Sequence, residues 1–180
     1  MSLRIISGKY GGRTIATSDS FKTHPMGDRI RGSLFNILGD LTGKRVLDAF
    51  AGSGSLGLEC VSRGATEAVF IERDRQAQKV IQENIVTLGA NDSAKLIRAS
   101  VSAWSETSPN ELFDLILVDP PYNDLQLSTV FRLKNHMQPN GLMVLSYPGR
   151  ESTPTVNGVV VVDKRSYGDA ALAFYRLAEH

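Results

Sequence analysis

Short, continuous runs of apolar residues alternate with longer amphipathic stretches through most of the chain. Runs such as 115–118 are typical of strands in a parallel sheet that is covered on both faces. Amphipathic stretches, with apolar residues three or four positions apart, are typical of helices. Their alternation predicts a doubly wound α/β fold. The predicted strands are 45–49, 67–71, 94–98, 113–118 and 141–147, and the predicted helices are 55–63, 74–88 and 125–137.

The N-terminal segment departs from this alternation. Residues 3–17 predict a hairpin, because Gly11 and Gly12 suit a tight turn between two short apolar segments. Residues 18–27 are polar and predict a loop. An amphipathic helix is expected to follow, with Asp28 in the position of its N-cap.

The C-terminal segment predicts two further strands, 159–162 and 171–177, which would form an antiparallel hairpin at the edge of the sheet. The expected fold is therefore a seven-stranded, mostly parallel sheet with an antiparallel C-terminal strand and a small N-terminal hairpin-plus-helix extension. We expect two parts: an N-terminal extension over residues 1–43 and an α/β domain over 44–180.

Composition narrows the class of protein. The single cysteine, Cys60, lies in an apolar segment and predicts core packing rather than a disulfide. No apolar run approaches the roughly 20 residues of a membrane span, and the chain shows no signal peptide. These features predict a soluble, cytoplasmic protein without a membrane partner, and we expect it to be a monomer.

Charge is distributed unevenly along the chain. Residues 1–45 carry eight Lys and Arg and three acidic residues, whereas residues 46–180 carry twelve basic and sixteen acidic residues. A basic segment of this kind indicates a surface for nucleic acid. A solvated surface without a partner would give the same composition, so charge alone leaves both interpretations open.

A cofactor site is predicted where the first strand of the sheet meets a glycine turn. Gly52 and Gly54 allow a sharp turn and a close approach of the backbone to a ligand. The spacing of 52–57 also matches a dinucleotide fingerprint, which keeps an NAD-dependent oxidoreductase as an alternative. Asp48 favours S-adenosylmethionine, because a carboxylate there would attract the cationic methionine end and repel a pyrophosphate. Glu72 can bind ribose hydroxyls of either cofactor.

A second site is predicted where strand 113–118 ends at Asp119, Pro120, Pro121 and Tyr122. The two prolines stiffen the chain and leave nearby carbonyl groups free to accept hydrogen bonds. Asp119 and the Pro120 carbonyl would hold the two hydrogens of an aromatic amine, and Tyr122 would stack on the ring, a contact worth about 1–3 kcal/mol. The pattern favours methyl transfer to an amino nitrogen, with orientation as the main source of catalysis.

Four segments together carry a resemblance to a known family. These are 4–13 (RIISGKYGGR), 28–38 (DRIRGSLFNIL), 47–54 (LDAFAGSG) and 119–122 (DPPY). They resemble the RsmD family of S-adenosylmethionine-dependent methyltransferases. The resemblance implies methylation of the N2 amino group of a guanine in bacterial 16S ribosomal RNA. The RNA or a small-subunit assembly intermediate would be the partner, and no metal would be needed.

The resemblance also assigns roles to residues. The expected cofactor-binding residues are Asp48, Ala49, Phe50, Gly52, Gly54, Glu72, Arg73, Ser100 and Val101. The expected catalytic residues are Asp119, Pro120, Pro121 and Tyr122. The expected RNA contacts are Arg4, Lys9, Arg13, Arg29 and Arg31. Two positions depart from the family pattern. His24-Pro25-Met26 stands where the family has Arg-Pro-Thr, which leaves an RNA or cofactor contact there unassigned. Ser100 stands where many such enzymes carry an acid that faces the adenine amine.

Other functions remain as alternatives. An N6-adenine DNA methyltransferase would need a target-recognition domain, for which 180 residues leave no room. A protein-glutamine methyltransferase would carry Asn at Asp119. An oxidoreductase would show a proton-transfer motif such as Tyr-x-x-x-Lys, and a non-catalytic RNA-binding module would be indifferent to Asp119→Ala.

Several residues have no assigned role. The three histidines are scattered along the chain and predict no metal site. Trp104 would either cover the adenine or pack under a loop, and Arg165 and Tyr167 could face the substrate. Asn84 and Asn123 are candidates for supporting polar contacts.

Overall fold

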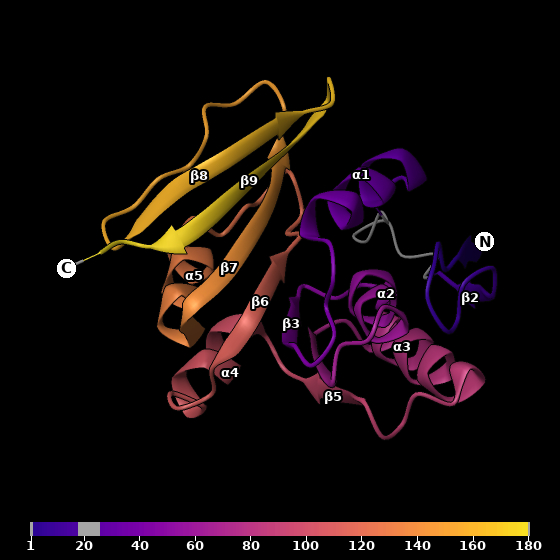
Figure 1. Cartoon of the computed structure of the whole chain (residues 1–180). Helices are drawn as coiled ribbons and strands as arrows, with labels where there is room; N and C mark the ends of the chain where they lie inside the picture. The colour runs from indigo at the N-terminus through magenta and orange to yellow at the C-terminus, as the bar shows by residue number, and fades with distance from the viewer. Residues whose placement is uncertain (1, 18–25, 180) are drawn as a thin grey trace.

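The computed structural model describes residues 2–17 and 26–179, and it contains the predicted seven-stranded sheet with the strand order β5-β4-β3-β6-β7-β9-β8 (Figure 1). The neighbouring strands from β5 to β7 are parallel, and β9 is antiparallel to both β7 and β8. The strands of this sheet are β3 (Arg45–Ala49), β4 (Glu67–Glu72), β5 (Ala94–Arg98), β6 (Phe113–Val118), β7 (Met137–Pro148), β8 (Val159–Ser166) and β9 (Ala170–Leu177). The fold predicted from the sequence is confirmed.

Helices cover both faces of the sheet. Leu34 and Leu56 pack against one face together with Leu115 and Leu117 of β6. Trp104 and Phe131 belong to the core on the other face. The helices on the first face are α1 (Asp28–Leu38), α2 (Ser55–Ser62) and α3 (Arg75–Leu88), and those on the second are α4 (Val101–Thr107), α5 (Leu127–Arg132) and the 3-10 turn η1 (Leu133–His136).

Two helical segments differ from the prediction. The helix predicted over 125–137 is α5 followed by η1, and β7 already begins at Met137. Helix α4 was not predicted, because its seven residues are too few and too polar to show a helical period. It begins after Ser100, whose hydroxyl accepts a hydrogen bond from the Ala103 amide at 3.1 Å.

The beginning of α1 corrects two expectations. Asp28 is the first residue of the helix rather than its cap, and the cap position, Gly27, makes no side-chain hydrogen bond. The Asp28 carboxylate binds the guanidinium of Arg31 at 2.8 Å, and Arg31 also donates to the Arg4 carbonyl at 2.9 Å. The Arg31 side chain is 0% exposed, so the expected contact of Arg31 with RNA is not supported. A buried guanidinium is not available to an RNA phosphate.

The N-terminal hairpin is joined closely to the rest of the fold. Its two strands, β1 (Ser2–Arg4) and β2 (Thr14–Ala16), pair with each other in a separate two-stranded sheet. The turn between them contacts the end of α2, where the buried Glu59 carboxylate accepts from the amides of Ile6 at 2.8 Å and Ser7 at 3.1 Å. Glu59 also pairs with Arg63 at 2.9 Å. The hairpin is therefore held by charge-assisted hydrogen bonds to a buried carboxylate.

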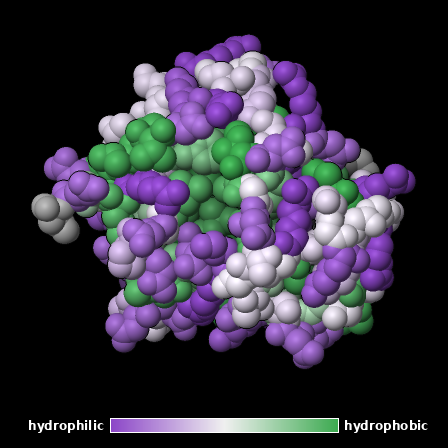
Figure 2. All heavy atoms as spheres, viewed as in Figure 1, coloured by the Kyte–Doolittle hydropathy of each residue, from purple (hydrophilic) through white to green (hydrophobic). Residues whose placement is uncertain are grey.

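Apolar side chains gather over the β7–β8–β9 end of the sheet in Figure 2, and β8 exposes Val160, Val161 and Val162. Strand β8 is an edge of the sheet, where free backbone groups can pair with another chain. A bulge between Val161 and Asp163 interrupts its register, which disfavours continuous pairing along this edge.

The structure also tests the expectations for Cys60, for Trp104 and for membrane-spanning helices. Cys60 is buried in the core, as predicted. Trp104 packs against Phe113 and His136, with ring centroids 6.1 and 4.5 Å apart, so packing rather than an adenine contact explains it. None of the helices formed by residues 2–17 and 26–179 combines the length and apolar character that crossing a membrane requires.

Replacing Glu59 with Ala should lower the free energy of unfolding by about 3 kcal/mol, because it removes a buried charge partner and leaves the Ile6 and Ser7 amides without their acceptor. Urea denaturation followed by circular dichroism measures this change. The exposed Glu83 on the neighbouring α3 is the control, and Glu83→Ala should change stability by less than about 0.5 kcal/mol. Equal effects of the two variants would contradict the assigned role of Glu59.

Candidate functional site

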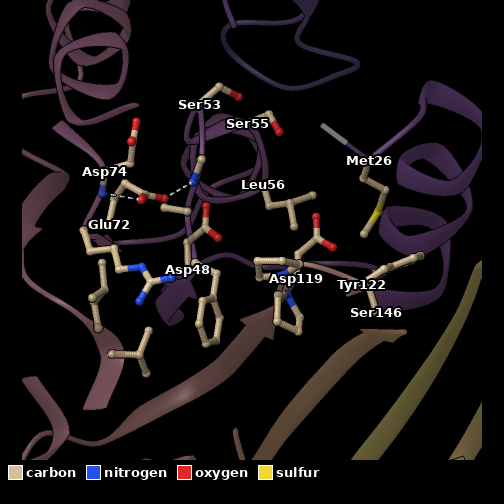
Figure 3. A pocket seen from close by; sticks show the side chains of 18 of the residues that line it. Met26, Asp48, Ser53, Ser55, Leu56, Glu72, Asp74, Asp119, Tyr122 and Ser146 are labelled. Atoms are coloured by element: carbon tan, nitrogen blue, oxygen red, sulfur yellow. Dashed lines mark hydrogen bonds between the residues drawn. The ribbon is translucent and has the colours of Figure 1, made fainter. Parts of the chain in front are cut away.

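A cavity of about 750 Å³ opens beyond the carboxyl ends of the parallel strands. This is where open α/β sheets bind their ligands. The cavity is lined from the glycine loop after β3, the ends of β4 and β5, the segment after β6 and the beginning of α1. Asp48 lies near the end of β3, and Asp119 directly follows β6. Figure 3 shows both carboxylates pointing into the same cavity.

The register of the sheet explains why its polar residues meet. Asp48 lies opposite Phe70 in β4 and Leu117 in β6, so Glu72 and Asp119, each two residues further on, point to the same face. Likewise Val118 lies opposite Leu145, which places Ser146 beside Asp119. All four side chains therefore lie on one face of the sheet, at the edge where the parallel strands end.

Most of the predicted cofactor and catalytic residues line the cavity. Ala49 and Gly54 do not, since Ala49 is buried in the core and Gly54 lies behind the loop against the Phe70 ring. Lining residues from the predicted set are Asp48, Phe50, Gly52, Glu72, Arg73, Ser100, Val101, Asp119, Pro120, Pro121 and Tyr122. The predicted RNA contacts Arg4, Lys9, Arg13, Arg29 and Arg31 are not among the lining residues.

The glycine loop has a left-handed backbone at three positions: Phe50 with φ 58°, Gly52 with φ 59° and Gly54 with φ 82°. This conformation is strained for an aromatic residue, and such strain often marks a functional site. Gly57 is needed for a different reason, because a Cβ atom there would lie 2.3 Å from the Phe70 ring. Its amide donates to the Asp48 carboxylate at 2.9 Å.

Glu72 holds the loops on both sides of the cavity. Its carboxylate accepts from the Gly52 amide and from the Asp74 amide, both at 2.8 Å, as the dashed lines in Figure 3 show. Burial raises the pKa of Glu72, while these backbone hydrogen bonds oppose the increase. Glu72 therefore shapes the glycine loop as well as facing the cavity.

The carboxyl groups of the cavity are poorly solvated and close to one another. Burial raises the pKa of Asp48 well above its usual range, and the charges of Asp119 and Glu72 raise it further. Burial likewise raises the pKa of Asp119 to about 7. A cation in the cavity would favour the ionised forms of these groups. The arrangement is therefore electrostatically suited to a positively charged ligand and unsuited to a pyrophosphate.

Tyr122 and Ser146 are joined by a short hydrogen bond, with 2.6 Å between the phenol and hydroxyl oxygens. Ser146 is buried in β7 and also interacts with the Asp119 carboxyl group, whose pKa it lowers against the larger effect of burial. Ser146 was not predicted from the sequence, because only the register of β6 with β7 places it at the site. The one local sign of a polar role was a serine inside an otherwise apolar strand.

The remaining wall of the cavity comes from the N-terminal part of the chain. Met26 and Ile30, together with Leu56 of α2, give this wall an apolar character that suits the face of a flat ring. Thr17 also lines the cavity. Of the departures from the family pattern, Met26 is thus at the cavity, whereas His24 and Pro25 lie outside the described residues.

Asn84 connects this wall to the glycine loop. Its buried side chain accepts from the Ala16 amide at 2.9 Å and donates to the carbonyls of Ala16 at 2.9 Å and Ser53 at 3.0 Å. Asn84 is therefore a supporting residue of the cavity, the role for which the sequence made it a candidate.

Arg165 and Tyr167 lie away from the lining residues. Arg165 pairs with Asp163 at 3.1 Å on β8. The Tyr167 phenol binds the Ser33 hydroxyl of α1. Tyr167 thus attaches the C-terminal hairpin to α1, and the possibility that these two residues face the cavity is not supported.

The family model described as conserved hypothetical protein 95 matches residues 3–176. The chain belongs to this family. Curated relatives with similarity along nearly their whole length carry ribosomal RNA methyltransferase names, so the resemblance to the RsmD family is confirmed.

Two relatives and one solved structure illustrate the similarity of this RsmD-family chain to known proteins. It is 32% identical to the putative rRNA methyltransferase YlbH of Bacillus subtilis, over 97% of this chain and 98% of that protein. It is 29% identical to ribosomal RNA small subunit methyltransferase D of Haemophilus influenzae, over 97% and 93% of the two chains. The structure of the putative methyltransferase yhhF from Escherichia coli superimposes with a TM-score of 0.87 at 29% identity, covering 98% of both chains.

Asp119→Asn should stabilise the RsmD-family chain increasingly as the pH rises. The folded state raises the pKa of Asp119 from 3.8 to about 7, so ionisation costs folding free energy between these values. The variant should therefore gain about 2 kcal/mol more over the wild type at pH 8 than at pH 5. Urea denaturation at the two pH values measures the difference. Asp124→Asn, an exposed change in the same segment, should show no such increase.

Proposed function

We propose that the protein transfers a methyl group from S-adenosylmethionine to the N2 amino group of a guanine in 16S ribosomal RNA. The observation that carries the proposal is the convergence of Asp48, Glu72 and Asp119 on one cavity. The first two suit a cationic nucleoside, and the third belongs to a rigid segment that suits an amine. Membership in the RsmD family and the names of the relatives support the same activity.

The residues present fit the proposed cofactor. S-adenosylmethionine supplies an activated methyl group on a sulfonium sulfur. Asp48 and the glycine loop would take its charged methionine end, Glu72 would accept from the ribose hydroxyls, and Ser100 with Val101 would border the adenine. Asp48 and Glu72 already make hydrogen bonds to backbone amides, so their carboxylates are oriented before a ligand arrives.

The segment after β6 would orient the amine. The Asp119 carboxylate and the Pro120 carbonyl would accept the two N2 hydrogens, which directs the nitrogen lone pair toward the methyl group. Formation of the N–C bond and loss of the C–S bond would leave a neutral thioether and a surplus proton on the nitrogen. An ionised Asp119 with a pKa of about 7 is a suitable acceptor for that proton.

The target base would lie between Tyr122 and the apolar residues of the N-terminal wall. Tyr122 is partly exposed at the cavity and offers an aromatic face for stacking. A guanine reaches such a pocket only when it is unpaired or flipped out of a helix. Four of the proposed RNA contacts are exposed: Arg4, Lys9, Arg13 and Arg29. Arg29 lies in the first turn of α1, between the lining residues Met26 and Ile30 in the sequence.

The division into an RNA-binding extension over 1–43 and a methyltransferase domain over 44–180 stays a prediction.

Asp119→Ala should reduce methyl transfer by about 100-fold or more, because it removes the acceptor that orients the amine and takes its proton. Binding of S-adenosylhomocysteine should be retained. Tritium transfer from labelled S-adenosylmethionine to small ribosomal subunits from a deletion strain measures the first effect, and calorimetry measures the second.

Asp92→Ala, an exposed acidic residue that does not line the cavity, is the matched control and should keep its activity. Naked 16S RNA and adenine-containing DNA duplexes, assayed beside the subunits, distinguish the substrates. Transfer to DNA but not to RNA, or full activity of Asp119→Ala, would overturn the proposal.

Arg29→Glu should weaken RNA binding and reduce its salt dependence, because an exposed cation beside the cavity would release counterions from a phosphate. The slope of log affinity against log salt should fall by about one. Lys95→Glu, the same charge reversal on the exposed side of β5, is the control. An unchanged slope for Arg29→Glu, measured by filter binding, would remove α1 from the RNA surface.

A further inference from the structure

Ser146 is the one buried polar side chain that β7 contributes to the lining of the cavity. Its position follows from the parallel register of β6 with β7, which places it beside Asp119. Its hydroxyl oxygen lies 2.6 Å from the phenol oxygen of Tyr122. Ser146 therefore bonds to Tyr122 and lies beside Asp119, the two side chains to which the proposed function gives a direct role at the amine.

We infer that Ser146 is a positioning residue, which orients the Asp119 carboxylate and holds the Tyr122 ring in place for the incoming base. This inference rests on the proposed function of the same cavity. It adds a residue of β7 to a site whose proposed amine contacts otherwise all come from the segment after β6.

The protons available limit how Ser146 can act. An ionised Asp119 can only accept, so Ser146 can offer it its single hydroxyl proton while the Ser146 oxygen accepts from the Tyr122 phenol. In that arrangement the phenol polarises the hydroxyl that lies beside the carboxylate.

The chain of hydroxyl groups opposes the electrostatic surroundings of Asp119. Burial disfavours its charged form, and the charge of Asp119 in turn raises the pKa values of Asp48 and Tyr122. Ser146 acts in the opposite direction and lowers the pKa of Asp119. The titratable residues that line the cavity are Asp48, Glu72, Arg73, Asp74, Asp119, Tyr122 and Asp124.

Ser146→Ala should move the titration midpoint of the Asp119 carboxyl carbon to higher pH by about one pH unit, because the carboxylate loses a donor. Carbon-13 NMR on the full chain measures this, with Asp119→Asn to assign the signal. The titration does not depend on turnover, so it tests the inference even if the proposed substrate is wrong. An unchanged midpoint would overturn the inference.

Methyl transfer to small ribosomal subunits provides the second test. Ser146→Ala should lower kcat about ten-fold at pH 7, move the acid limb of the pH profile upward, and leave the affinity for S-adenosylhomocysteine within about two-fold. Ser146→Thr, which keeps the hydroxyl, should restore the wild-type profile.

Ser105→Ala is the matched control. Ser105 is also buried and loses a comparable hydrogen bond, of 2.9 Å to His136, on the opposite face of the sheet. It should alter stability without altering the profile, and equal losses of kcat in the two alanine variants would reduce Ser146 to a structural role. If the wild type transfers no methyl group, the proposed function fails, and the NMR titration still decides the inference.

Discussion

The parallel register of the central strands is the constraint on which the site depends. Side chains that share a register row between neighbouring strands must share a face of the sheet. Asp48, Glu72, Asp119 and Ser146 are distant in sequence but are brought to one face by this rule. A slip of one residue between β6 and β7 would turn Ser146 away from Asp119 and into the opposite core.

This convergence has an energetic cost that the surrounding structure must offset. Burial raises the pKa values of Asp48, Glu72 and Asp119, the charges of Asp119 and Glu72 raise that of Asp48 further, and Phe50 adds a strained backbone conformation. The fold compensates with hydrogen bonds from the Gly52, Gly57 and Asp74 amides and with dense packing of the glycine loop on Phe70. Such a site is stable in the absence of a ligand but is stabilised further by a cation, which links binding to the protonation of its acids.

The sequence predicted most of the fold and the central part of the site, because both depend on local patterns. Continuous apolar runs marked the strands, and the glycine loop and the DPPY segment marked their functional ends. Ser146 was missed because it depends on partners far away in the chain, with which no local pattern connects it. Asn84 was a candidate, but its partners Ala16 and Ser53 are equally distant and were not predicted. Arg31 was misassigned for the same reason, because helical spacing shows which residues share a face but not that β1 and its Arg4 carbonyl cover that face.

The N-terminal segment shows how folding changes the meaning of a charge pattern. Its excess of basic residues suggested one continuous RNA-binding surface, but Arg31 is buried, and Arg45 pairs with Glu67 and Glu111. Part of this charge is thus neutralised, that of Arg31 by Asp28 within the segment and that of Arg45 by two later acids. The same segment also contributes Met26 and Ile30 to the cavity and is tied to the glycine loop through Asn84. It therefore forms one wall of the cavity as well as offering cations at the surface, and that wall is connected mechanically to the glycine loop.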